Sequence, residues 1–536
     1  MKKKLILLLV VVLALSLAVV ACSRDNEGEN NNSNNNNAQV EQSGPYGTLK
    51  IASVDFSYES TDPINYESLW GFAMYDPLIT IDENGNYIGG VAEDWELSED
   101  GLTWTFYIRK GIKFHNGDEL TAHDVKFSVD RFANQSEIES TNPWTPYLAG
   151  NYNYTEVVDD YTFRYHCQRP ELPLLVPFSW TRIIPKNYYE EVGMEEFRKN
   201  PIGSGPYKFV ELVPETSFKM EANTEHWRFK PDFMYVEEYQ VPEEMTRINM
   251  LRTGEVDIAL GITNERMVEL RDNEGFATVK VGDPVLWTIS FPGTWSTRRP
   301  TGDIRVRQAM SYAINREELC ESYFKGLAVP GGRWYMHPGC YGWDPSWKPD
   351  PYDPELAMQL LEEAGYPDAF EDKEIIFYVT PGPMVEQAQL LQDYWRKVGV
   401  EVDVQTIDTT QWSGMFFIRN TEPDAPNVGN IFPWQFSSTF NSVYQSANMF
   451  TSNGVHSTGN DAKADELYQK VVSELDPVLA EQYWTEFRDY VEGLYYNVGI
   501  CIIEPNILVN PETVGEFTAC TNMTLYDALA GIKHPK

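Results

Sequence analysis

The 536-residue sequence is short of positive charge, cysteine and histidine. It has 42 lysines and arginines against 80 aspartates and glutamates, which gives a formal net charge of −38 at pH 7. Binding to nucleic acid needs a basic surface that neutralises the phosphate backbone, and an acidic chain has little of it. We therefore exclude a nucleic-acid partner. Seven histidines and six cysteines, with no paired metal-ligand spacing, leave little material for a metal site. We therefore predict no metal and no cofactor.

Signatures of enzymes are also missing. No Gly-x-x-x-x-Gly-Lys-Ser/Thr loop for binding nucleotide phosphates occurs. The segment Gly203-Ser204-Gly205 lacks the Gly-x-Ser-x-Gly spacing of a hydrolase nucleophile, and no histidine is placed by a motif to act as its base. We predict that the chain is not an enzyme, and a surface hydrolase is the least favoured class.

The N-terminus has the pattern of a secretory leader. Lys2, Lys3 and Lys4 precede an apolar run that begins at Leu5 and stops at Cys22. Small residues before a cysteine at this point resemble the lipobox of bacterial lipoproteins. We predict a lipoprotein signal peptide over 1–21 and lipidation of Cys22. A plain transmembrane anchor is the alternative, because the run is just long enough to span a bilayer.

An asparagine-rich segment follows the leader. Residues 30–37 are all asparagine except Ser33, and such a tract cannot bury apolar surface. We predict a disordered tether over 22–44. Because the body is acidic, the lipid must hold it at the membrane. The expected location is the outer face of the cytoplasmic membrane, or the periplasmic side in a bacterium with two membranes.

Five cysteines remain in the part predicted to be exported: Cys167, Cys320, Cys340, Cys501 and Cys520. An odd number in an oxidising compartment leaves at least one without a partner in the chain. Sequence distance favours a bridge between Cys320 and Cys340. Buried free thiols are the alternative for all five.

Hydrophobic periodicity in the body indicates an α/β protein. Residues 102–108 alternate as a half-buried strand, and a helix is expected from Thr121 with Val125, Val129 and Phe132 inward.

Further helices are expected over 242–251, with Met245, Ile248 and Leu251 inward, from Asp353 to Gly365, and over 388–398. Helix, glycine and strand recur in that order, which is typical of α/β folds. No internal repeat or second low-complexity linker is present.

Five motifs resemble a known family, the family 5 solute-binding proteins of ABC transporters for peptides, nickel and related solutes. They are AEDWELSEDGLTWTFYIRKGIKFHNGDELTAHDVKFSVDRF (92–132), NPIGSGPYKF (200–209), LRTGEVDIALG (251–261), DIRVRQAMSYAINREEL (303–319) and YDPELAMQLLEEAGY (352–366). The resemblance runs from about residue 49 to the C-terminus.

The resemblance implies a two-lobed periplasmic-binding-protein-like α/β fold of class II, cluster C type. The first lobe would comprise 45–285 plus 500–536, with an extra subdomain near 68–190, and the second lobe would comprise 286–499. A hinge would join the lobes, and the ligand would be enclosed between them.

The function implied is capture of a small solute, with peptides as the first choice, and its delivery to an ABC importer. Permease and ATPase subunits would be separate chains, and the binding protein would be a monomer. Oligosaccharides or other neutral polar solutes, and metal complexes or opines, are alternative ligands. A non-transport surface receptor that hands its closed form to a signalling partner is an alternative role.

The signature residues are interpreted mainly as architecture. The glycines are expected at turns and close contacts, and the arginines in internal charge-assisted hydrogen bonds. These residues are Gly101, Gly111, Gly117, Gly203, Gly205, Arg305, Arg307 and Arg316.

Ligand contacts are expected around Trp434. Peptide-binding members of the family have a Trp followed three positions later by an Asp, whose carboxylate meets the ammonium of the peptide. Here Ser437 stands at the Asp position, so the usual anchor is missing and an uncharged ligand gains weight. Asp424 could replace the carboxylate if the loop is rearranged.

Aromatic residues are dense in this region. Stacking on a ligand is predicted for Trp434, Phe436 and Trp412, whereas filling of the core is the alternative. Asn427, Asn430, Gln435 and Ser437 are candidate hydrogen-bond partners of the ligand, and solvent-exposed loop positions are the alternative for them. His456 is the weakly supported metal candidate.

Overall fold

The computed structural model describes residues 45–56, 59–64, 70–82, 86–133, 145–281, 284–332, 346–370, 373–416, 425–437, 449–452, 460–515 and 528–535. The chain divides into Met1–Ser43 and the body Gly44–Lys536, and only the body is considered below. The predicted leader, the tether and Cys22 lie outside the described residues. Among the helices of the described ranges, none combines the length and the apolarity needed to cross a bilayer.

The first sheet has seven strands in the order β12-β19-β11-β1-β10-β9-β8. Its strands are β1 (Tyr46–Ser53), β8 (Tyr207–Val213), β9 (Ser217–Ala222), β10 (Phe233–Gln240), β11 (Ile258–Ala259), β12 (Ala277–Lys280) and β19 (Asn506–Val509). β1 runs parallel to β10 and β11. Ile51 packs into one core, whereas Ala52 packs into another together with residues of α7 (Glu244–Thr253) and α8 (Asn264–Glu274). Both faces of this sheet are therefore covered.

A four-stranded antiparallel sheet forms a subdomain inserted after β1. Its order is β4-β5-β7-β6, from β4 (Ala92–Leu97), β5 (Thr103–Ile108), β6 (Tyr152–Asp159) and β7 (Thr162–Cys167). Other elements of this part are α1 (Gly71–Met74), β2 (Ile79–Ile81), β3 (Tyr87–Gly89), α2 (Ala122–Ala133), α3 (Thr145–Asn151), η1 (Leu172–Leu174), α4 (Leu175–Trp180), α5 (Lys186–Val192) and α6 (Met194–Lys199). The seven-stranded sheet and this subdomain are called the first lobe below.

The predicted strand and helix of the subdomain are confirmed. In β5, Trp104, Phe106 and Ile108 are buried, whereas Tyr107 between them is exposed. The carboxylate of Asp124 accepts hydrogen bonds from the backbone N and Oγ1 of Thr121, which satisfies donors at the start of α2. The residues expected inward, Val125, Val129 and Phe132, are buried.

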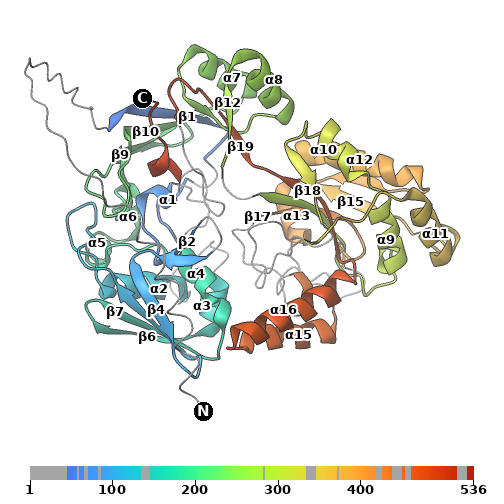
Figure 1. Cartoon of the computed structure of the whole chain (residues 1–536), viewed down its shortest axis with the longest axis horizontal. Coiled ribbons are helices and arrows are strands. Elements are labelled where there is room, and N and C mark those ends of the chain that lie inside the picture. The colour runs from blue at the N-terminus through green and yellow to red at the C-terminus, as the bar shows by residue number, and fades with distance from the viewer. Residues whose placement is uncertain are drawn as a thin grey trace, which may run out of the picture. The chain divides into compact units, whose positions relative to one another are not determined.

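The second lobe is built on another four-stranded sheet, in the order β14-β18-β13-β17. Figure 1 labels β17 and β18 of this sheet. The strands are β13 (Val285–Ser290), β14 (Ala328–Pro330), β17 (Phe432–Ser437) and β18 (Asn497–Ile503), beside a parallel pair β15 (Ile376–Val379) and β16 (Asp403–Thr406). Its helices are α9 (Ile304–Tyr312), α10 (Arg316–Ser322), α11 (Pro354–Ala364), α12 (Pro383–Lys397), α13 (Thr409–Phe416), α15 (Ala462–Ser473) and α16 (Pro477–Glu492), and short turns are η2 (Pro300–Gly302), η3 (Asp368–Phe370) and, near the C-terminus, η4 (Leu529–Gly531).

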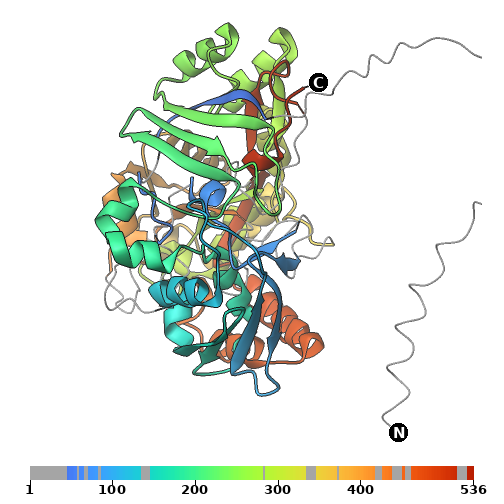
Figure 2. The same ribbon diagram turned by 90° about the vertical axis from the view of Figure 1, so that its left-hand side faces the viewer.

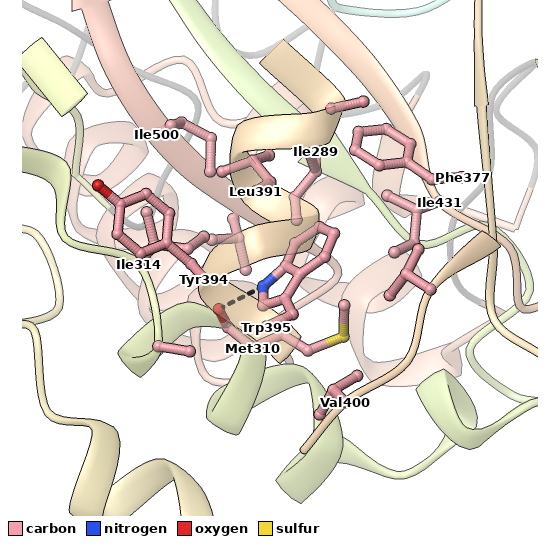
Figure 3. Packing of buried hydrophobic residues seen from close by; sticks show 14 of the residues in the cluster. Ile289, Met310, Ile314, Phe377, Leu391, Tyr394, Trp395, Val400, Ile431 and Ile500 are labelled. Carbon is pink, nitrogen blue, oxygen red and sulfur yellow. Dashed lines mark hydrogen bonds between the residues drawn. The ribbon is translucent and has the colours of Figure 1, made fainter. Parts of the chain in front are cut away.

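Trp395 is central to the core of the second lobe (Figure 3). It is fully buried on α12, and its indole N–H donates to the backbone O of Met310 on α9 at 2.9 Å. Side chains of the sheet pack into the same cluster, among them Ile289 of β13 and Ile500 of β18. Satisfying the one polar atom of a buried Trp lets it contribute its full apolar surface to the core.

The predicted cap of α11 and the glycines predicted to end two helices hold in the second lobe, although α12 begins at Pro383 and not at the expected residue 388. Asp353 accepts a hydrogen bond from the backbone N of Leu356, and Gly365 ends α11 with a left-handed φ of 78°. Gly399, also with a positive φ, follows the end of α12.

One predicted core position is wrong. Met245 is 46% exposed, although Ile248 and Leu251 are buried as expected. The inner position of the first turn of α7 is occupied by Arg247, whose guanidinium donates to the carbonyls of Val241 and Gly261 among others. A buried arginine with backbone partners therefore displaces the methionine from the core.

Gly203 and Gly205 are close-contact positions, as predicted. A Cβ on Gly203 would lie 2.0 Å from the backbone O of Met74, and a Cβ on Gly205 would lie 2.5 Å from the carbonyl carbon of Met74. The imidazole of His115 joins the same contact: its Nδ1 accepts from the backbone N of Gly203 and its Nε2 lies 3.0 Å from the backbone O of Gly205. Two separate motifs of the sequence, 92–132 and 200–209, are therefore parts of one packed junction.

Two of the three signature arginines, Arg307 and Arg316, have the predicted internal role. The side chain of Arg305 is instead 40% exposed and forms its ion pair with Asp303 near the surface. Arg307 donates to the backbone O of Thr301 and Tyr495, and Arg316 donates to the backbone O of Gly499. Both guanidiniums are buried, and they bind α9 and α10 to the end of α16 and to β18.

Two chain segments cross between the lobes, and they lie side by side. β12 leads into β13, and β18 leads into β19 through Glu504 and Pro505. The backbone N of Val281 donates to the O of Pro505 at 2.9 Å, and Lys280 forms a 2.7 Å ion pair with Glu504. The strand β19, drawn in red, therefore belongs to the same seven-stranded sheet as β1, drawn in blue (Figures 1 and 2). The boundary expected at 499/500 falls within β18, because the sheets change between Ile503 and Asn506.

A second contact joins the subdomain to the turn between α15 and α16. Gly101, at the β4–β5 turn, has a φ of 71°, and a Cβ there would lie 2.9 Å from side-chain atoms of both Leu475 and Pro170. Leu475 therefore packs against the backbone of the first lobe. This is the close contact predicted for Gly101.

We expect His115 to make stability fall in mild acid. Burial lowers the pKa of His115 to about 4, so between about pH 6.5 and pH 4 the unfolded chain binds a proton that the folded chain does not. From pH 7.5 to pH 5 this residue should cost about 2 kcal/mol of unfolding free energy, and the loss should level off below pH 4. Urea titration of wild type and His115→Gln at both pH values measures this loss of stability. Gln is the chosen substitution because its neutral amide can keep both hydrogen bonds.

The matched control for this titration is His123→Gln, which changes an exposed histidine. It should keep the pH dependence of the wild type. An equally steep fall in His115→Gln and in wild type would contradict the assignment.

Candidate functional site

The candidate site is an aromatic stack between β17 and α13. The three rings meet at the corners of a triangle. The ring centroid of Phe416 is 4.8 Å from that of Trp412 and 4.7 Å from that of Trp434, with interplanar angles of 20° in both pairs, and the two tryptophan centroids are 5.9 Å apart. The two tryptophans are themselves near parallel, at 13°. The sequence therefore folds three of its clustered aromatic residues into one set of stacked rings.

Burial separates the roles of the three rings. Trp412 and Phe416 are 7% and 2% exposed and belong to a core cluster with Phe432, Trp484 and Phe487. Trp434 packs against this cluster but is only half-buried. Trp434 is therefore the ring of the stack with surface left to meet a ligand, and the other two hold it in place.

The strand that carries Trp434 is the edge of its sheet. β17 pairs with β13 on one side, with Trp434 opposite Thr288 and Ser437 opposite Val285. Gln435 is exposed. The side chains of Phe436 and Ser437, and all of Asp424, lie outside the described residues.

Two of the predicted hydrogen-bonding amides are used inside the protein. The Nδ2 of Asn427 donates to the backbone O of Met415, and the Nδ2 of Asn430 donates to the backbone O of Pro426. Both side chains are buried. Asn427 ties the loop before β17 to the end of α13, whereas Asn430 closes a turn within the loop itself, and both bonds help to position Trp434.

Two histidines of the first lobe, His115 and His226, are engaged in structure. His226 lies 3.2 Å from the carboxylate of Asp76, which also accepts hydrogen bonds from Ser204 and Trp227. His456, the predicted metal candidate, lies outside the described residues. Within the described part of the chain, no group of three or more His, Cys, Asp or Glu side chains could hold a metal ion.

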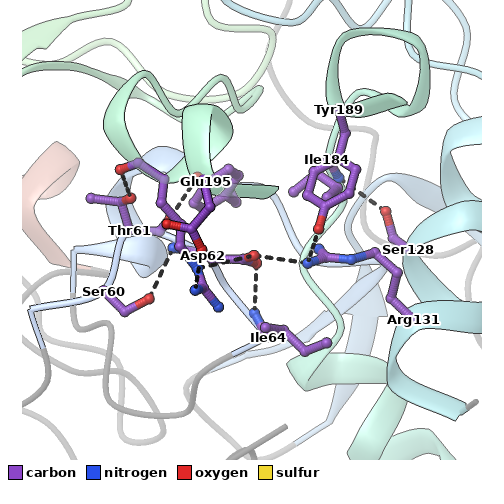
Figure 4. A network of polar contacts seen from close by, with 11 residues as sticks. Ser60, Thr61, Asp62, Ile64, Ser128, Arg131, Ile184, Tyr189 and Glu195 are labelled. Carbon is purple, nitrogen blue, oxygen red and sulfur yellow. Dashed lines mark hydrogen bonds and ion pairs between the residues drawn. The ribbon is translucent and has the colours of Figure 1, made fainter. Parts of the chain in front are cut away.

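A buried ion pair that the sequence reasoning did not single out lies in the first lobe (Figure 4). The carboxylate of Asp62 is fully buried and accepts from Arg131 at 2.8 Å and from the backbone N of Ile64 at 3.2 Å. The guanidinium of Arg131 also lies 4.4 Å from the centre of the Tyr189 ring. The pair fixes the segment that follows β1 against α2 of the subdomain. The Asp62-Pro63 dipeptide was the available signal, because Asp before Pro often begins a turn.

Comparison with solved structures identifies the fold. Among solved structures, NikA from Brucella suis in complex with Fe(III)-EDTA aligns with a TM-score of 0.79 and 20% identity over 91% of this chain and 100% of that one. The periplasmic binding protein DppA from Helicobacter pylori in complex with peptide STSA aligns with a TM-score of 0.74 and 21% identity over 91% and 98%. The predicted two-lobed α/β fold of periplasmic binding proteins is confirmed.

Sequence comparison places the chain within a family. The profile of bacterial extracellular solute-binding proteins, family 5 (middle region), matches residues 86–460, and the chain belongs to this family. It is also 28% identical over 351 residues to the dipeptide-binding protein of Escherichia coli K12, over 60% of this chain. The match spans 63% of the length of that relative, less than two thirds. These relatives are named as binding proteins and not as enzymes.

Replacing the two tryptophans should separate ligand binding from stability. Trp412→Ala should lower the free energy of unfolding by about 3–5 kcal/mol, because it empties a buried site. Trp434→Ala should cost clearly less stability but weaken solute binding about tenfold or more, because an aromatic contact is lost. Urea unfolding and binding of the co-purified solute measure the two effects.

Trp434→Phe is the matched control, because it keeps a flat ring on the stack, and it should retain most of the binding. The assignment fails if Trp434→Ala binds like wild type, or if it is as unstable as Trp412→Ala.

Proposed function

We propose that this chain is an extracytoplasmic solute-binding protein that captures a small solute between its lobes and delivers it to an ABC importer. The observation that supports this most directly is the pair of adjacent crossings at Val281 and Pro505. Two neighbouring connections let one lobe rotate against the other about a single line, which is the geometry of hinge closure. Permease and ATPase subunits would be separate chains, and the binding protein would act as a monomer.

Closure would be driven by the solute. A ligand that contacts both lobes binds the closed form better than the open form, and the closed population rises by that difference in affinity. The packing of Leu475 against Gly101 joins the lobes at a second place, away from the crossings. Because Leu475 and Gly101 belong to different lobes, this apolar contact forms only when the two lobes approach each other.

Peptides are the solute class we put first. The relatives include a dipeptide-binding protein, and a structural neighbour holds a peptide. Ser437 stands where the resemblance implies a carboxylate, so a peptide would need another partner for its ammonium, with Asp424 as the candidate. A neutral polar solute such as an oligosaccharide, stacked on Trp434, is the alternative that the missing carboxylate favours.

Native mass spectrometry of a soluble form that starts at Gly44, compared with the denatured sample, tests the proposal. We expect a bound species in the native spectrum that is lost on denaturation and reduced in Trp434→Ala. A mass composed of amino-acid residues supports the peptide class, whereas hexose or pentose increments support the oligosaccharide.

If the native protein is empty, a library of di- to tetrapeptides and oligosaccharides should be added and closure followed by small-angle X-ray scattering. Failure of every member to bind or to compact the protein would contradict solute capture. Turnover of an added peptide or glycoside would favour the hydrolase alternative.

We further propose that residues 1–21 are a signal peptide and that Cys22 carries lipid. The full-length protein should then partition into the detergent phase of Triton X-114, whereas Cys22→Ser should remain uncleaved at the lipoprotein site and should not incorporate an alkyne-labelled fatty acid. Cys167→Ser is the matched control, because it removes a buried cysteine of the body and should label like wild type. Equal labelling of Cys22→Ser and wild type would contradict lipidation at Cys22.

A further inference from the structure

Two cysteines that are far apart in the sequence meet in the core of the second lobe. Cys320 is on α10 and Cys501 is on β18, 181 residues further on, and their Sγ atoms are 3.0 Å apart. Both side chains are buried, at 4% and 0% exposed, among the residues that surround Trp395. Cys167, by contrast, is a buried thiol in the core of the subdomain.

The surroundings suit an uncharged sulfur pair. Burial raises the pKa of the Cys501 thiol far above its ordinary range, so a thiolate is disfavoured there. The buried cation nearby, Arg316, is already used: it donates to the backbone O of Gly499 and to Oγ of Ser311. As thiols, the two sulfurs could make one weak S–H···S hydrogen bond, whereas a disulfide is neutral and needs no hydrogen-bond partner.

We propose that Cys320 and Cys501 form a disulfide bond in the exported protein and that this bond joins α10 to β18. The sulfurs need to approach by only about 1 Å to reach the bonded distance of about 2 Å. The inference depends on an extracytoplasmic location, where disulfides form and persist.

The chemistry is an exchange with a disulfide-bonded oxidant, such as the oxidised dithiol of an extracytoplasmic oxidoreductase. The thiolate of one cysteine attacks the oxidant disulfide and forms a mixed disulfide, and the second cysteine attacks that bond and releases the oxidant as a dithiol. The two cysteine thiols lose two protons and two electrons, and the oxidant disulfide gains them. Because both sulfurs are buried in the native state, we place the reaction during folding, before the core closes.

The bond would strengthen the lobe without restricting the crossings. It closes a loop that contains most of the second lobe, so it limits the unfolded chain. Residues 504 and 505, which carry the chain to the first lobe, follow Cys501 outside that loop. The predicted partner of Cys320, Cys340, lies outside the described residues, and Cys320 has a free thiol in the structure. The pairing with Cys501 replaces that prediction.

Peptide mapping of the exported protein tests the pairing. The full chain is expressed with its own leader, the extracytoplasmic fraction is denatured and alkylated without reductant, and the digest is analysed by mass spectrometry. We expect the peptide containing Cys320 linked to the peptide containing Cys501, lighter by two hydrogen atoms than the sum of the free peptides. Reduction should release both.

Alkylated Cys320 and Cys501 in the exported fraction, or Cys320 linked to another cysteine such as Cys340, would overturn the proposal. Finding the chain only in the cytoplasm would instead overturn the proposed location, and the fractionation distinguishes the two failures. In Cys501→Ala, Cys320 should become alkylated, whereas Cys167→Ser should keep the bridge.

Stability gives a second measurement. Dithiothreitol should lower the urea midpoint of wild type and of Cys167→Ser, but it should leave that of the double variant Cys320→Ala/Cys501→Ala unchanged. An equal shift in all three proteins would show that the reductant acts elsewhere and would contradict the bridge.

Discussion

The architecture depends on the two crossings between lobes being neighbours. The hydrogen bond from Val281 to Pro505 and the ion pair between Lys280 and Glu504 hold the segments together where each leaves the first sheet. Each lobe has its own apolar clusters, so it can keep its packing while its orientation changes. Widely separated crossings would have locked the lobes, whereas neighbouring ones leave one easy axis of rotation.

Sequence patterns correctly predicted the helices and strands that are determined by residues close together in the chain. The alternation in 102–108, the cap formed by Thr121 and Asp124, and the glycine that ends α11 all act within a few residues, so they could be read from the sequence. Met245 failed because the partners of Arg247 lie on neighbouring segments that a helical pattern does not reveal. Sequence distance favoured Cys340 as the partner of Cys320, whereas the fold places Cys501 there, which pairing by proximity along the chain cannot anticipate.

The sequence predicted where the candidate site lies, but not which of its aromatic residues faces a ligand and which fill the core. The resemblance pointed to Trp434, and the density of aromatic residues pointed to its neighbours. Only burial distinguishes the half-buried Trp434 from Trp412 and Phe416 beneath it. The pair of Asp62 and Arg131 was missed because its partners are 69 residues apart and neither lies in a pattern specific to ion pairs.

The position of β19 in the first sheet constrains the order in which the protein can be made. β19 pairs with both β11 and β12, although more than 200 residues of the second lobe separate it from β12 in the chain. During synthesis from the N-terminus, β11 can pair with β1 early, but β12 must wait for β19, so the first lobe cannot complete its sheet until nearly the whole polypeptide has emerged. Export of an extended chain across a membrane requires that the chain has not yet folded, and this delay keeps the first lobe incompletely folded during most of synthesis.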